Sequence, residues 1–253
     1  MTHVGAQDSV VVVAGATSAS GRATVAALRA AGATAVAVGS NADHLTEAFG
    51  ASADAHDGGV PQFACDLADL AATQSLAADV RARFGRVDGV IHLVGGWRGG
   101  GTFAQQGDAD WDFLVRGCVT TLRNTSRAFF DDIAASPTGR FAMVSTTTLA
   151  RPSAANANYQ AAKAAAEAWT RSMAQGLALL QSKRPEKDGG PLPQASAAVV
   201  LAVKALLDDA MREASPERTF PGYTPVDVLA ERAVTLFSRD AAEINGARID
   251  LTS

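Results

Sequence analysis

Cysteine and histidine are scarce in this sequence. Only two cysteines and four histidines occur among its 253 residues, and Cys65 and Cys118 form neither a CxxC pair nor a spaced framework. A small secreted domain held by disulfides is therefore excluded, and a zinc site built from clustered Cys and His ligands is not expected. We expect no metal site, and the cysteine usage is typical of a protein from a reducing cytoplasm.

Excess basic charge and long apolar runs are also missing. The formal net charge is −4 and the isoelectric point is about 5.5, which argues against a nucleic-acid-binding surface. The longest apolar run, residues 197–203, is far too short to cross a bilayer. Because no cationic region precedes the first apolar stretch, we expect no signal peptide. These features predict a cytoplasmic protein that binds neither nucleic acid nor membrane.

What the sequence does contain is a regular alternation of buried strands and helices. Residues 10–13 are four consecutive valines, typical of a parallel strand that is buried on both faces. Further strands are expected at residues 34–38, 62–65, 87–94, 141–144, 197–203 and 247–251. The pattern predicts an α/β fold: a single Rossmann-like domain, residues 1–253, with a doubly wound parallel sheet of about seven strands and helices on both faces.

Helical and loop-like segments fill the intervals between these strands. Helices are expected at residues 22–31, 69–84, 108–135, 156–181 and 226–237. Polar or proline-rich loops are expected at 50–59 and 182–194, and residues 204–223 are expected to cap a substrate site. In the glycine-rich stretch 97–107, Trp97 and Arg98 either contact substrate or form a packing lid.

The turn after the first strand is rich in small residues. Gly15 and Gly21 lie in the sequence AGATSASG, between a strand and a helix, the layout that directs backbone N–H groups at a phosphate; a plain strand-to-helix turn is the alternative. The second strand ends at Gly39 and Ser40 with no acidic residue and no nearby Arg or Lys. Such an end tolerates a 2′-phosphate, while Asn41 alternatively only caps the next helix.

Tyr159 and Lys163 are four residues apart in an alanine-rich helix and so share one helical face. A nearby ammonium lowers the pKa of a phenol, and such a pair can move a proton at a carbonyl or hydroxyl. Asp66, after the third strand, either caps the following helix or contacts an adenine edge. His92, in the middle of the fourth strand, is expected to be a satisfied core histidine.

Together these motifs resemble the short-chain dehydrogenase/reductase (SDR) family over nearly the whole chain. The TGxxxGxG motif of that family falls on residues 14–21, its NNAG motif on residues 92–95, and its YxxxK motif on Tyr159 and Lys163. Asp66 stands where the family has an aspartate that contacts adenine, and residues 244–249 are similar to the segment that leads into the last strand of the family.

The resemblance implies an active site and a cofactor. Tyr159 would be the general acid/base, and Lys163 would lower its pKa and bind the nicotinamide ribose. Thr146, thirteen residues before the tyrosine, or Ser145 would hold the substrate oxygen. The cofactor would be NAD(P), with NADP favoured because no carboxylate follows the second strand. The implied cofactor-binding residues are Gly15, Thr17, Ser18, Ala19, Ser20, Gly21, Ser40, Asp66, Leu67, Val94, Gly95 and Lys163.

Several positions depart from the family pattern. Cys118 stands at the place of the asparagine of the family's catalytic tetrad, Ala19 at that of the middle glycine, and residues 203–204 replace a Pro-Gly pair. The expected function is hydride transfer between nicotinamide and a small carbonyl or alcohol substrate. The alternatives are a catalytically weakened homologue that binds a cofactor or partner, and epimerisation or dehydration on the same scaffold. The resemblance also implies a homodimer or homotetramer formed through helices 108–135 and 156–181.

Overall fold

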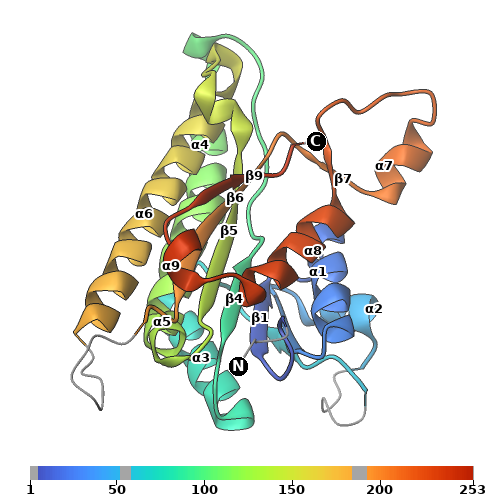
Figure 1. Ribbon diagram of the computed structural model, residues 1–253. Coiled ribbons are helices and arrows are strands. Elements are labelled where there is room, and N and C mark those ends of the chain that lie inside the picture. Colours follow the sequence, from blue (N-terminus) through green and yellow to red (C-terminus); the bar gives the residue numbers. More distant parts are fainter. Residues whose placement is uncertain (1–4, 52–57, 184–192, 253) are drawn as a thin grey trace.

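The computed structural model describes residues 5–51, 58–183 and 193–252. It is built around a seven-stranded parallel sheet in the order β3-β2-β1-β4-β5-β6-β9, flanked by helices on both faces (Figure 1). The doubly wound sheet expected from the sequence is therefore confirmed. Most of the loops expected at 50–59 and 182–194 lies outside the described residues.

The sheet strands are β1 (Val10–Ala14), β2 (Thr34–Gly39), β3 (Gln62–Ala64), β4 (Gly89–His92), β5 (Arg140–Thr146), β6 (Ala197–Val203) and β9 (Arg248–Asp250). The helices are α1 (Ala19–Ala30), α2 (Ala42–Phe49), α3 (Leu70–Phe84), α4 (Asp108–Leu114), α5 (Thr121–Ala135), α6 (Ala157–Ser182), α7 (Asp209–Ala214), α8 (Val226–Thr235) and α9 (Ala241–Ile244). A separate pair of two-residue strands is formed by β7 (Leu206–Leu207) and β8 (Thr224–Pro225).

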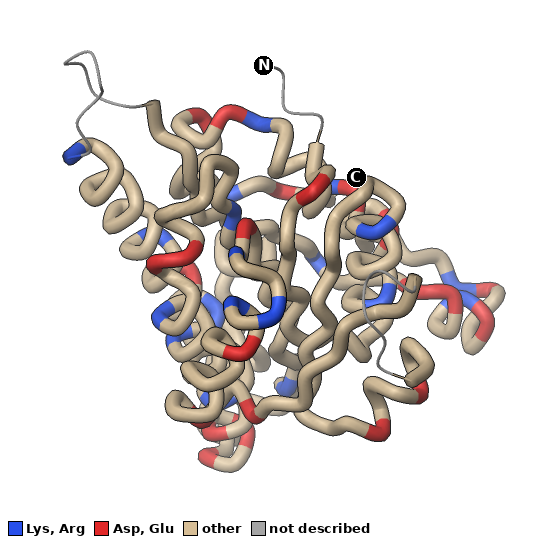
Figure 2. Tube along the Cα trace, turned by 90° about the horizontal axis from the view of Figure 1, so that it is seen from below, with Lys and Arg blue, Asp and Glu red and all other residues tan. Residues whose placement is uncertain are grey.

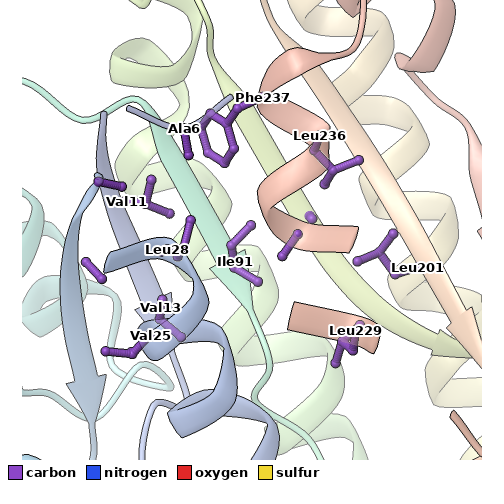
Figure 3. Close-up of a cluster of buried hydrophobic side chains, with 14 of the residues drawn as sticks. Ala6, Val11, Val13, Val25, Leu28, Ile91, Leu201, Leu229, Leu236 and Phe237 are labelled. Carbon is purple, nitrogen blue, oxygen red and sulfur yellow. The ribbon is translucent and has the colours of Figure 1, made fainter. Parts of the chain in front are cut away.

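The valines of β1 contribute side chains to two hydrophobic cores, one on each face of the sheet. Val11 and Val13 join the cluster under α1 and α8, while Val10 and Val12 join the cluster under α3, α5 and α6. Figure 3 shows the first of these clusters, in which Phe237 closes one end. Because successive side chains of a strand point to opposite faces, a central strand with two covered faces favours apolar residues along its length.

Most charged residues lie at the periphery, although Asp88, Arg140, Lys163 and Glu167 are buried. Figure 2 shows Lys and Arg interspersed with Asp and Glu, mostly on helices and loops at the periphery. None of the helices in the described part of the chain has both the length and the apolar character needed to cross a membrane.

Several helices and strands begin or end at other residues than the sequence suggests, and capping side chains explain the helix starts. The first helix begins at Ala19 instead of residue 22, because the Ser18 side chain accepts a hydrogen bond from the Gly21 N–H at 3.0 Å. Asn41 caps α2, which is one of its two expected roles. Asp69, and not Asp66, caps α3. The fourth strand is shorter than the expected residues 87–94, and the fifth extends to Thr146.

The helix expected over residues 108–135 is interrupted by a π-helical segment, Val115–Thr120, which joins α4 to α5 and contains Cys118. Such wide turns are rare in proteins, and those that occur are often found at functional sites. The segment expected to cap the substrate site contains β7 and α7, which project from the carboxyl edge of the sheet (Figure 1). Both features lie at the end of the molecule where the strands terminate.

Candidate active site

The carboxyl ends of the parallel strands meet at one edge of the sheet, where ligands bind in open α/β folds. In the register of the sheet, Ala14 lies beside His92, and Thr146 lies beside Val203. A cavity of about 650 Å³ opens at this edge. Its walls come from the ends of β4, β5 and β6, from α6 and from the capping segment, and they include the predicted site residues Ser20, Val94, Gly95, Ser145, Thr146, Tyr159 and Lys163.

Tyr159 and Lys163 project from the first and second turns of α6 toward the end of β5. Lys163 is only 7% exposed, and its Nζ donates a hydrogen bond to the Val144 carbonyl at 2.8 Å. The same Nζ lies 6.0 Å from the centroid of the Tyr159 ring. The ammonium is thereby fixed by the sheet beside the phenol, and both groups face the cavity.

Burial raises the pKa of Tyr159 to about 12, an effect that a hydrogen bond with the Thr146 side chain partly offsets and that Cys118 reinforces. This differs from the sequence-based expectation that Lys163 would lower the pKa. The reason is that desolvation of the phenolate is the largest cause, while Lys163, whose ammonium donates to Val144, is not among the groups that shift this pKa. Tyr159 therefore keeps its proton throughout the neutral range.

The two hydroxyls at the end of β5 have different partners. The Ser145 hydroxyl donates to Glu167 Oε1 at 2.6 Å. The Thr146 hydroxyl lies 3.0 Å from that of Thr148 and hydrogen-bonds with Tyr159. Of the two candidates, Thr146 thus directs its hydroxyl toward the phenol, while that of Ser145 is held by a buried carboxylate.

Buried Glu167 and exposed Arg248 form an ion pair that the sequence analysis missed. Arg248 Nε lies 3.1 Å from Glu167 Oε1, and Arg248 Nη2 donates to the Thr146 carbonyl at 2.8 Å. The pair thus contacts the last two residues of β5. A signal was present in the sequence, because Glu167 follows Lys163 by the same four residues that separate Lys163 from Tyr159.

The glycine turn after β1 packs closely against neighbouring backbone. Gly15 has φ 82°, and a Cβ built on it would lie 3.1 Å from the Leu93 carbonyl carbon. A Cβ on Gly21 would lie 2.3 Å from the Gly15 carbonyl oxygen. The first N–H groups of α1 have no acceptor within the helix and lie at its positive end, which suits a phosphate. Ala19 takes the first helical position and is half-buried, as is Thr17.

A guanidinium lies near the end of β2, where the sequence suggested no cation. Arg22 Nη1 donates to the Thr17 carbonyl at 2.5 Å. The Thr17 methyl group lies 3.4 Å from a Cβ built on Gly39. Arg22 is seventeen residues before Gly39 in the chain. Thr17 therefore contacts both Arg22 and the end of β2, and Ser40, the residue after that strand, is exposed.

Asp66 and Leu67 lie after β3, outside the 650 Å³ cavity. Asp66 Oδ1 accepts from the Ala68 N–H at 2.9 Å, and its Oδ2 forms a 2.6 Å ion pair with Arg116. Leu67 is buried, and its carbonyl accepts from Asn124 Nδ2 at 3.0 Å. These partners fix the loop at the carboxyl edge. Across the described ranges, no group of three or more His, Cys, Asp or Glu side chains is arranged to hold a metal ion.

Comparison with known proteins gives the family. Residues 9–181 match the sequence profile of the family described as short chain dehydrogenase. The chain belongs to the short-chain dehydrogenase family. Cys118, which is buried next to Tyr159 in this family member, stands where the family pattern has an asparagine.

Solved structures of other short-chain dehydrogenases share the fold. A short chain dehydrogenase from Salmonella enterica serovar Typhi is 18% identical, with a TM-score of 0.81 and coverage of 98% of this chain and 97% of that one. A putative short chain dehydrogenase from Shigella flexneri complexed with NADP is 18% identical, with a TM-score of 0.79 and 99% of both chains covered. A 3-ketoacyl-(acyl-carrier-protein) reductase from Brucella melitensis complexed with NADH is 20% identical, with a TM-score of 0.77 and 97% of both chains covered.

His92 replaces the first asparagine of the NNAG motif in this short-chain dehydrogenase. It is 2% exposed, and its Nε2 lies 3.2 Å from Thr121 Oγ1. Because Thr121 Oγ1 donates its own hydrogen to the Gly117 carbonyl, Nε2 is the protonated nitrogen. Nδ1 has no hydrogen-bond partner within the described residues, so His92 is satisfied at only one nitrogen. Burial, with a smaller effect from Lys163, lowers the pKa of His92 to about 3.

This lowered pKa predicts acid sensitivity. A group whose pKa is depressed on folding stabilises the protein above its ordinary pKa, near 6.5, and that contribution is lost as the pH falls toward 3. Between pH 6.5 and 5 the loss from His92 is about 2 kcal/mol of unfolding free energy. His92→Asn should remove this part of the pH dependence in urea unfolding at pH 7.5 and 5.0. His44→Asn, on the exposed face of α2, should leave it unchanged; equal slopes in all three proteins would contradict the assignment.

Proposed function

We propose that this protein is an NAD(P)-dependent oxidoreductase that reduces a carbonyl group, with Tyr159 as the proton donor. The observation that carries the proposal is the meeting of the Tyr159 phenol, the Lys163 ammonium and the Thr146 hydroxyl in one cavity at the carboxyl edge of the sheet. Membership of the short-chain dehydrogenase family supports the reaction type. The relatives complexed with NADP and NADH support a nicotinamide cofactor.

The residues around the glycine turn fit such a cofactor. Gly15 allows the turn to pack tightly against the residues that follow β4, and the N-terminus of α1 faces the same edge of the sheet as the cavity. In this proposal the turn from Gly15 to Gly21 binds the pyrophosphate, and Val94 and Gly95 flank the nicotinamide half. Ser40, Asp66 and Leu67 hold the adenosine half. When bound, the nicotinamide supplies the hydride.

The side chains in the cavity supply the proton chemistry. The Thr146 hydroxyl and the Tyr159 phenol hold the carbonyl oxygen, and Tyr159 donates its proton to that oxygen as negative charge develops there. A pKa of about 12 keeps the donor protonated and favours reduction over alcohol oxidation near neutral pH. Lys163 uses one of its three N–H donors on Val144, which leaves the others for the ribose hydroxyls.

A catalytically weakened homologue that binds a cofactor or partner is the second candidate, and Cys118 is the observation that favours it. The buried thiol lies against Tyr159, where the family pattern has an amide. A thiol is a weak hydrogen-bond donor and a poor support for a proton relay. This candidate predicts cofactor binding without turnover, whereas the oxidoreductase proposal predicts both.

We also propose a homodimer or homotetramer formed through α5 and α6. A shallow groove between their outer faces is lined by Ser126, Arg127, Phe130, Asp131, Trp169, Ser172 and Met173. Gly176 lies against the Phe130 ring, and because it has no side chain, a second pair of helices can approach this surface closely. Aromatic, Met and Arg side chains are enriched at interfaces of this kind.

Tyr159→Phe tests the proton donor. Reduction of a panel of aldehydes and ketones by NADPH or NADH should fall by roughly 10²–10⁴-fold, while cofactor affinity measured by fluorescence should stay nearly unchanged. In the wild type, kcat/KM for reduction should be flat from pH 6 to 9. For alcohol oxidation, kcat/KM should rise about tenfold per pH unit, because the phenolate fraction rises below a pKa of about 12. Turnover that persists in the variant would show that another group donates the proton.

Thr146→Val tests which hydroxyl holds the substrate oxygen. Loss of an oriented donor should lower kcat by roughly 10²-fold, and Thr146→Ser should retain most of the activity because it keeps the hydroxyl. Ser145→Ala is the matched control, since the Ser145 hydroxyl donates to Glu167. It should alter the free energy of unfolding by about 1 kcal/mol with little change in kcat. The reverse ranking of the two losses would assign the role to Ser145.

Arg22→Ala tests the preference for NADP. The guanidinium beside Gly39 is the cation available to a 2′-phosphate, so the variant should bind NADPH about tenfold more weakly and NADH about as well as the wild type. Both affinities are measured by the fluorescence of the reduced nicotinamide. Arg29→Ala, in the last turn of the same helix, should leave both affinities unchanged. A wild type that prefers NADH would overturn the NADP assignment.

A further inference from the structure

The cavity contains a second cation that the proposed chemistry does not use. Lys204 directly follows β6 and lines the cavity together with Lys163. Val203, the residue before it, is the register partner of Thr146 in the neighbouring strand. Since paired strands lie about 4.8 Å apart, the backbone that carries Lys204 is close to the hydroxyl proposed to hold the substrate oxygen.

Lys204 is exposed, and the partners of its ammonium are a backbone carbonyl and an aromatic ring. Its Nζ donates to the Pro221 carbonyl at 2.7 Å and lies 5.6 Å from the centroid of the Tyr223 ring. Within the described residues, Lys204 forms no ion pair with a carboxylate, and the cavity wall includes no acidic side chain. One used donor out of three leaves two N–H groups for a ligand. An uncompensated positive charge in a partly enclosed site favours an anionic ligand.

Part of the cavity wall is apolar. Leu206 and Met211 come from the capping segment, Val144 and Val203 from the sheet, and Trp97 from the loop after β4. Met211 is 37% exposed and Trp97 is 62% exposed, so these two side chains form an apolar rim at the mouth. The Trp97 indole donates to Asn156 Oδ1 at 3.0 Å, which ties this rim to the start of α6. A ligand with one anionic group and an apolar body matches this distribution.

We propose that Lys204 binds the carboxylate of an oxo acid whose carbonyl group is reduced at Tyr159. This inference rests on the proposed function and specifies its substrate class. The hydride passes from the reduced nicotinamide to the carbonyl carbon, and the Tyr159 proton passes to the carbonyl oxygen. The oxo acid becomes a hydroxy acid, the dinucleotide is oxidised, and the carboxylate is unchanged. Because Lys204, Thr146 and Tyr159 line the same cavity, we take short 2- and 3-oxo acids as the substrates to test.

Matched substrates test the charge on the substrate directly. For 2- and 3-oxo acids compared with their methyl esters, the wild type should favour the acid by roughly tenfold or more in kcat/KM, the usual effect of a hydrogen bond to a charged group. Lys204→Met keeps the length of the side chain and removes the charge. It should lower kcat/KM for the acids to the level of the esters and leave the esters unchanged. Lys204→Arg should keep the acid preference, and Lys183→Met, an exposed lysine at the end of α6, should behave as wild type.

A binding measurement separates the substrate from the other available anion, the pyrophosphate of the dinucleotide. Titration calorimetry with a 2-hydroxy acid and with its amide, both in saturating NADP, should show tighter binding of the acid to the wild type and equal binding to Lys204→Met. The affinity for NADPH should be the same in both proteins. A fall in NADPH affinity, or an equal fall for acids and esters, would overturn the proposal in favour of a pyrophosphate contact or of a support for the capping segment.

Failure of the substrate class is distinguishable from failure of the proposed function. If the wild type reduces neutral carbonyl compounds and shows no preference for acids, the role of Lys204 is refuted while the oxidoreductase proposal stands. If it reduces neither acids nor neutral compounds although it binds NADPH, both proposals fall.

Discussion

The hydrogen bond from Lys163 Nζ to the Val144 carbonyl is the interaction on which the site depends. A buried ammonium is costly unless it finds acceptors, and the end of β5 supplies one at 2.8 Å. Meeting that requirement fixes the rotation of α6 against the sheet. Tyr159, one turn earlier on the same face, is thereby set against Thr146. The orientation of the phenol follows from the need to satisfy a neighbouring charge.

The contact between α6 and β5 continues on either side of this bond. Tyr159, Lys163 and Glu167 are spaced by four residues, and they contact the Thr146 hydroxyl, the Val144 carbonyl and the Ser145 hydroxyl respectively. Three successive turns of one helix thus hold the last three residues of one strand. Arg248 completes the arrangement from β9 by binding both Glu167 and the Thr146 carbonyl. The end of β5 is therefore fixed through backbone and side chains, as a preorganised site requires.

The sheet was predictable from the sequence because strands with two covered faces leave a strong signal, as the valine run of β1 shows. The spacing of Tyr159 and Lys163 predicted only that they share a helical face, and the pair became a candidate site through the glycine turn and strand order around it. The different partners of the Ser145 and Thr146 hydroxyls were not predictable, because they depend on where Glu167 and Tyr159 lie in three dimensions. The direction of the Tyr159 pKa depends on burial, which spacing does not reveal. Arg22 was missed because its proximity to Gly39 exists only in three dimensions.

The π-helical segment Val115–Thr120 has a consequence for what insertions and deletions this region tolerates. A wide turn holds one residue more than an α-helical turn, which offsets the faces before and after it by about 100°. The offset lets α5 bury Leu122 in the core while α4 brings Phe113 against Gly96 beside the cavity. Removing a single residue here would restore a regular helix and swing the aromatic side chains of α4 away from the mouth. The number of residues between α4 and α5 is therefore constrained by the cavity as well as by the core.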